Sequence, residues 1–179
     1  MRHAGGMHDE AHASTRSDAA LVVAGWLAIA APLLAIALKL PTGGWLLVGM
    51  FFSFPIWLLG YAAVITAAVS MLRRRGALRA PGHRTRAVIW AWITSIGVMI
   101  VGFTVVDGGD TSESVASTLG LVVGQTGSGS PINDISNAIA AVAAIAWLGG
   151  WLALVVEWMI AVARRRQDAP RVAAPVVGA

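Results

Sequence analysis

The chain has 179 residues, a net charge of +4, 57% hydrophobic residues and only 12% charged residues. Its apolar share exceeds that of soluble domains, and its charged share is about half of theirs, so the composition indicates an integral membrane protein. There is no cysteine, which excludes disulfides, thiolate metal sites, iron–sulfur clusters and cysteine nucleophiles. Arginine is far commoner than lysine and alanine is abundant, a composition that we associate with a bacterial genome rich in GC.

Four apolar segments have the roughly 20 residues that a helix needs to cross about 30 Å of hydrocarbon. None of them alternates apolar and polar residues as barrel strands do, which favours helices. The second and fourth exceed the minimum length by more than a turn, so we expect them to tilt, kink or project from the bilayer. The sequence therefore predicts an all-α fold with four transmembrane helices, at about residues 19–40, 45–72, 87–106 and 138–163.

The polar amino-terminal segment, residues 1–18, contains most of the histidines. His8 and His12 are four residues apart, so a helix would place them on one face beside acidic neighbours. His3 with a free amino terminus has the donor set of a square-planar copper or nickel chelate. These three histidines are candidate metal ligands, but the segment lacks apolar periodicity. We favour a disordered cytoplasmic tail and expect no cofactor.

Arginines gather in two segments, one in the short loop between the second and third predicted helices and one after the fourth. By the positive-inside rule both segments are cytoplasmic, and so are both termini. The opposite side carries mainly acidic residues, with Lys39 as its cation. We interpret the arginines first as topological anchors and second as contacts for anionic lipid headgroups. The arginines are Arg73, Arg74, Arg75, Arg79, Arg84, Arg86, Arg164, Arg165 and Arg166. The last three begin a basic carboxy-terminal tail, residues 164–179.

A second topology stays open. The triplet Ala35-Ile36-Ala37 ends an apolar run with the small residues that a signal peptidase requires. The long preceding segment, in which acidic residues offset the basic ones, argues against cleavage. Cleavage would leave three helices in the same orientation.

Glu157 is the ionisable residue inside a predicted helix, and such a residue is a functional candidate by default. It lies about two turns from the Arg164 cluster, so we expect an ion pair with Arg164, or with Arg73 or Arg74. The alternative is a proton relay or cation site. That alternative needs a partner acid or histidine at membrane depth, and we find none in the helices.

Large rings fall at similar depth near the middle of the predicted helices, close to Pro32 and Pro55, which tend to kink a helix. They could line a small apolar pocket or fill the space between irregular helices, and we favour packing. The pocket candidates are Trp57, Tyr61, Trp147 and Trp151.

Small residues recur at intervals of four in three helices, which resembles the contact pattern of membrane helix pairs. The pattern gives more close-approach faces than a monomer needs, so we expect association with itself or with another membrane protein. The positions are Ala20, Ala24 and Ala28, then Ala63 and Ala67, then Gly149 and Ala153.

The outer loop, residues 107–135, has an organisation of its own. Asp110 and Glu113 have the spacing of a capping box, and apolar residues follow at helical intervals from Val115. We predict a short interfacial helix there. We expect Asp107 and its acidic neighbours to be solvated, because they lack the ligand order of a calcium loop.

These patterns predict a small non-enzymatic protein of the plasma (inner) membrane. It would serve as an accessory or assembly subunit that acts through helix packing and a basic cytoplasmic face. Its partners would be the lipid bilayer, anionic headgroups and another membrane protein or itself, and not nucleic acid. The alternative is a homo-oligomeric pore or transport protein, including a holin-like lysis protein. No nucleophile with a base, metal set or carboxylate pair supports an enzyme.

Overall fold

The computed structural model describes the backbone of residues 4–168 and the side chains of residues 18–168. This part of the chain is helical and contains no strand, only an isolated bridge between Asp107 and Ala116. Three short 3-10 turns connect the helices: η1 (Leu40–Thr42), η2 (Ala77–Arg79) and η3 (Ser112–Ser114). The α-helices are α1 (Ala4–Lys39), α2 (Trp45–Phe52), α3 (Phe54–Leu72), α4 (Arg84–Thr104), α5 (Thr118–Val122) and α6 (Pro131–Asp168).

Four segments are long and apolar enough to span a membrane: Asp18–Thr42, Phe54–Leu72, Arg84–Thr104 and Pro131–Asp168. Their outward faces carry large apolar side chains, as at Val142, which is 70% exposed. Such a surface suits hydrocarbon and not water. The predicted all-α fold with four membrane-spanning helices is confirmed.

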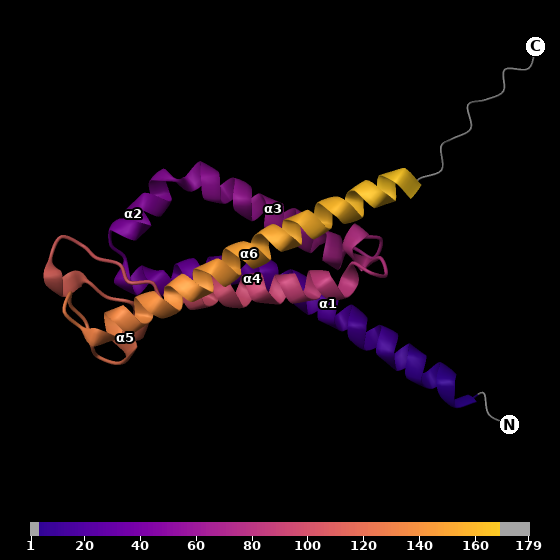
Figure 1. Ribbon diagram of the computed structural model, residues 1–179, viewed down its shortest axis with the longest axis horizontal. Helices are drawn as coiled ribbons and strands as arrows, with labels where there is room; N and C mark the ends of the chain where they lie inside the picture. Colours follow the sequence, from indigo (N-terminus) through magenta and orange to yellow (C-terminus); the bar gives the residue numbers. More distant parts are fainter. Residues whose placement is uncertain (1–3, 169–179) are drawn as a thin grey trace, which may run out of the picture.

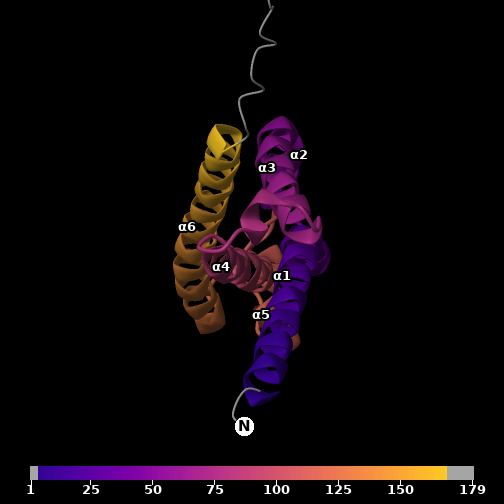
Figure 2. The same ribbon diagram turned by 90° about the vertical axis from the view of Figure 1, so that its right-hand side faces the viewer.

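Helix α4 is the centre of the arrangement. It lies between α1 and α6, and α3 packs against α1 and also meets α6 (Figure 1; Figure 2). Two glycines let its backbone approach its neighbours. A Cβ added at Gly97 would lie 2.9 Å from the backbone of Trp147 on α6, and one at Gly102 would lie 2.6 Å from the carbonyl oxygen of Ala35 on α1. Close backbone approach of this kind is how helices associate where no hydrophobic force drives them together.

The buried face of α1 is a stripe of small residues. Ala24, Ala28, Ala31 and Ala35 follow one another at intervals of three or four and are at most 6% exposed. Ala20, which we predicted in the same contact, is exposed. Residues four apart are rotated by about 40° relative to one another around the helix axis. Ala20 is therefore rotated by about 80° from Ala28, which takes it off the buried face.

The predicted helix over residues 45–72 is in fact two helices. Helix α2 ends at Phe52 and α3 begins at Phe54, because Pro55 has no N–H to continue the ladder of hydrogen bonds. The indole Nε1 of Trp57 donates to the freed carbonyl oxygen of Met50 at 3.0 Å. No residue of α2 is buried, and α2 with the start of α3 stands away from α4 and α6 (Figure 1).

The outer loop contains the expected short helix, but it starts later than we predicted. The segment at Asp110 and Glu113 forms only the turn η3, and α5 begins at Thr118. Its cap is Ser117, whose hydroxyl accepts a hydrogen bond from the N–H of Gly120 at 2.9 Å. Serine is among the favoured N-cap residues, and this one lies where the chain turns inward.

The two ends of the chain are more helical than predicted. Helix α1 begins at Ala4, so the helix that we predicted from about residue 19 extends further toward the amino terminus. Extending an existing helix needs no new nucleus, and the segment has no proline to stop it. Helix α6 begins at Pro131 and continues to Asp168, and it includes the first residues of the predicted basic tail. The rest of that tail lies outside the described residues.

The close contact between α1 and α4 is testable by adding one methyl group. Gly102→Ala should lower the free energy of unfolding by about 1–3 kcal/mol, because the new Cβ overlaps the α1 backbone. Gly149→Ala on α6 is the matched control, since a Cβ there has nothing within 4 Å. It should be neutral or stabilising by up to about 1 kcal/mol. Unfolding in mixed detergent micelles, followed by circular dichroism, measures both, and equal effects would contradict the contact.

Candidate functional site

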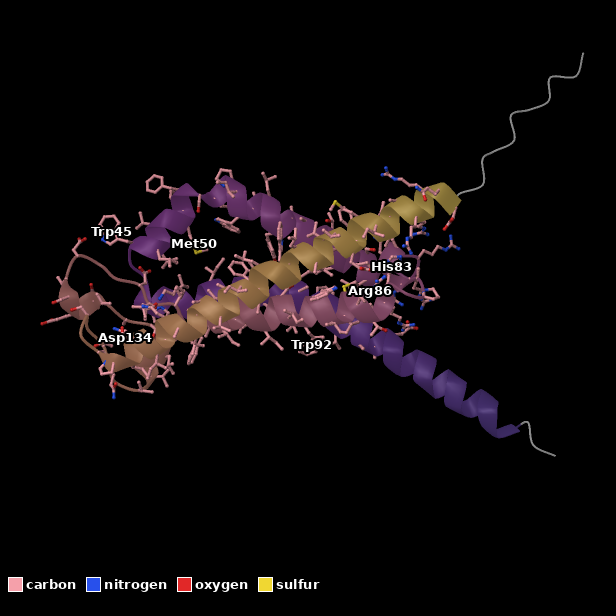
Figure 3. The ribbon with its side chains drawn as sticks, viewed as in Figure 1. Trp45, Met50, His83, Arg86, Trp92 and Asp134 are labelled. Atoms are coloured by element: carbon pink, nitrogen blue, oxygen red, sulfur yellow. The ribbon has the colours of Figure 1, made fainter. Side chains whose placement is uncertain are left out.

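Glu157 lies in a buried polar cluster with His83 and Arg86. The carboxylate Oε1 accepts a hydrogen bond from Nδ1 of His83 and lies 3.1 Å from Nη2 of Arg86. Glu157 and His83 are 7% and 5% exposed, whereas more than half of the Arg86 side chain is exposed. Figure 3 shows His83 and Arg86 at the start of α4. A carboxylate that also pairs with the Arg86 guanidinium is an acceptor, and the tautomer of His83 with its proton on Nδ1 matches it.

The local sequence explains why His83 reaches into the bundle. Pro81 and Gly82 form a tight turn, and Gly82 has a φ of +90°, which favours glycine. His83 occupies the N-cap position of α4 without a capping hydrogen bond from its side chain, and Arg86 lies within the first turn. The carboxylate of Glu157 therefore faces the amino-terminal end of α4, where the helix dipole also favours negative charge.

Our predicted partners for Glu157 were wrong. Its cation is Arg86, together with His83, and not Arg164, Arg73 or Arg74. Our predicted helices left His83 in the loop before residues 87–106, because the sequence does not show that the turn folds back onto α6. A histidine directly after Pro-Gly, at the start of an apolar helix, was the available signal.

Four of the nine arginines that we singled out have defined contacts through their side chains to Asp18, Glu157 or a backbone carbonyl group. Asp18 on α1 lies 3.3 Å from Arg79 and 2.5 Å from Arg84. Arg165 on α6 donates to the carbonyl oxygen of Arg75. Together with the pair of Glu157 and Arg86, these contacts tie α1, α4, α6 and the loop into one surface. We call it the basic end, formed by residues 73–86 and 164–166.

Charged side chains are separated along α4 by its full length. Along α4 the next charged side chains that the structure describes lie beyond its other end, at Lys39 and Asp107. The 21 residues of α4 separate the two ends by about 30 Å. The contacts of Glu157 with His83 and Arg86 join α6 to the start of α4.

A second polar cluster lies at the opposite end, and it corrects our expectation for Asp107. This side chain is not solvated but 4% exposed, and it accepts hydrogen bonds from the N–H groups of Gly44, Leu46 and Gly108, each at 2.9 Å. Lys39, also buried, donates from Nζ to the carbonyl oxygen of Val105 at 2.7 Å. The cluster fixes the turn after α1 against the segment after α4. We call this the loop end.

The four aromatic residues of the predicted pocket do not share one partner. Tyr61 donates to the carbonyl oxygen of Ile29 on α1 at 2.7 Å, and Trp151 donates to that of Gly60 on α3 at 3.1 Å. Trp147 packs against α4, and Trp57 bridges the break between α2 and α3. Each ring uses its polar atom or its apolar body to hold a different pair of segments.

The candidate metal ligands of the amino-terminal segment lie outside the described side chains. His3 lies outside the described residues, and His8 and His12 lie on α1, where their side chains are not described. Within residues 18–168, no three metal-ligating side chains of His, Asp or Glu gather.

Two of the surface grooves lie between helices of the bundle. One, of about 640 Å³, lies between α4 and α6 and is lined by apolar residues alone. Another, of about 570 Å³, lies at the basic end between α3, the following loop and α6. No family model, curated protein or solved structure matches the chain, so these features stand on their own geometry.

The buried pairing of Glu157 predicts a large loss on truncation. Glu157→Ala should lower the free energy of unfolding by about 3 kcal/mol, because it leaves His83 buried without its partner. Arg164→Ala is the control and should change it by less than about 0.5 kcal/mol, since Arg164 is exposed. Titration with sodium dodecyl sulfate in mixed micelles measures both values. Similar losses of unfolding free energy in the two variants would contradict the pairing with His83 and Arg86 and would favour an ion pair with Arg164.

Proposed function

We propose that this chain is a non-enzymatic accessory subunit of the plasma (inner) membrane, with both termini in the cytoplasm. In this proposal it docks a transmembrane helix of another membrane protein into the groove between α4 and α6. The groove is the observation that carries the proposal. Its walls are Trp92, Ile93, Ile96, Gly97 and Ile100 on α4, and Ala138, Ile139, Val142, Ala143 and Ala146 on α6.

The α6 wall of the groove has the small residues that close helix approach requires. Ala138 and Ala146 are exposed there, and Gly149 continues the same side of α6 with open space around it. Of the predicted small-residue pair, Gly149 is exposed and Ala153 is half-buried. Gly149 therefore makes no close packing inside the chain. Gly150 packs closely instead, where a Cβ would lie 2.9 Å from Thr94. The side of α6 that carries Gly149 thus stays free for another helix.

The distribution of charge supports the proposed orientation. The basic end collects the arginines of two segments, and the loop end carries Asp110, Glu113 and Asp134. The positive-inside rule places the basic end in the cytoplasm.

Single cysteines test the orientation, because the native chain has none. In intact cells a membrane-impermeant maleimide should label Ser128→Cys, at the loop end. It should label Arg74→Cys, at the basic end, only after permeabilisation. Both side chains are exposed on the protein, so labelling depends on whether the maleimide reaches that side of the membrane. The reverse pattern would contradict cytoplasmic termini.

Purification at native expression level in gentle detergent, followed by mass spectrometry of the intact complex, tests the partner. We expect a stoichiometric second protein that is lost by at least tenfold with Ala146→Leu, which fills the groove. Ala37→Leu is the matched control on the exposed side of α1 and should retain the partner. A defined homo-oligomer without a second protein would refute the accessory role and favour a pore.

A further inference from the structure

The groove at the basic end differs from the one between α4 and α6, because it joins an apolar floor to a basic rim. Its floor includes Ile65, Val69 and Val162, and Trp158 lines it from α6. Its rim is formed by Arg73, Arg75, Arg165 and Arg166. A surface that is apolar on one side and cationic on the other matches an anionic amphiphile.

The rim arginines are not neutralised within the part of the chain whose side chains are described. Asp18 and Glu157 are used by Arg79, Arg84 and Arg86. No carboxylate of residues 18–168 lies within 4 Å of a rim arginine. Four like charges therefore surround one groove, and an anion there would relieve their mutual repulsion.

The loop that carries Arg73 and Arg75 is held in place by contacts to α3. The N–H of Leu78 donates to Oγ of Ser70 at 3.2 Å, and Nε of Arg79 donates to the carbonyl oxygen of Met71 at 2.8 Å. A Cβ at Gly76 would overlap the carbonyl oxygen of Ser70, so glycine allows the loop to fold back this tightly. On the other wall, Arg165 donates to the carbonyl oxygen of Arg75. The rim is thus formed before any ligand binds, which lowers the entropic cost of binding.

We infer that this groove is a binding site for an anionic phospholipid. The phosphate lies among the rim arginines, and an acyl chain lies along the floor between α3 and α6. The positions of the residues along the helices agree with this placement: the floor belongs to membrane-spanning helices, Arg73 and Arg75 follow the end of α3, and Arg165 and Arg166 lie in the last turn of α6. Trp158 stands at the level where indoles favour the membrane interface.

The test uses the full chain in nanodiscs that contain phosphatidylglycerol and phosphatidylcholine, with native mass spectrometry of the lipids that stay bound. We expect selective retention of phosphatidylglycerol. Arg73→Gln with Arg166→Gln removes two rim charges and should weaken this retention at least tenfold. Inorganic phosphate in excess should not displace the lipid, because it cannot use the apolar floor.

The control is Arg74→Gln with Arg164→Gln. These arginines belong to the same two segments and carry the same charge, but they do not line the groove. This pair should retain phosphatidylglycerol within about twofold of the native chain, because exposed charges away from a site contribute little. Equal losses in both pairs would overturn the site and leave only a general attraction to anionic membranes. Displacement by phosphate would overturn the acyl-chain contact.

Discussion

Hydrocarbon offers charged groups neither water nor counter-ions, and this constraint places the charged contacts of the bundle at the two ends of α4. At the basic end, Glu157 of α6 meets His83 and Arg86, and Asp18 of α1 meets Arg84. At the loop end, Asp107 fixes the turn after α1. The central helix is therefore held at both ends by polar contacts, and its register against α1 and α6 follows from them.

Between these two ends, close packing of complementary helix surfaces holds the bundle together. Gly97 and Gly102 allow α4 to touch α6 and α1 backbone to backbone, where dispersion contacts are densest. Aromatic residues complete the packing by donating to carbonyl groups of neighbouring helices, as Tyr61 and Trp151 do. The break at Ser53 has the opposite effect, because it turns α2 away and leaves that helix without a buried residue.

Both grooves result from this uneven packing. Helix α6 packs closely along α4 but meets α3 less extensively, near Gly60 and at the basic end. The α4–α6 groove offers apolar and small residues and suits another helix, whereas the α3–α6 groove adds arginines and suits an anionic lipid. Helix α6 thus lines both grooves. The residues that it contributes are apolar in the α4–α6 groove and include arginines in the α3–α6 groove.

The sequence by itself determined the all-α fold and the four membrane-spanning segments, because the length and apolarity of a segment alone decide whether it can cross hydrocarbon. It also singled out Glu157 as the charge that needs a partner. It did not reveal that His83 and Arg86 are those partners, or that Gly150 rather than Gly149 contacts α4. Such pairings depend on the rotation of each helix about its axis and on how a loop folds back. Only the tertiary structure decided these, since contacts between residues far apart in the chain set both.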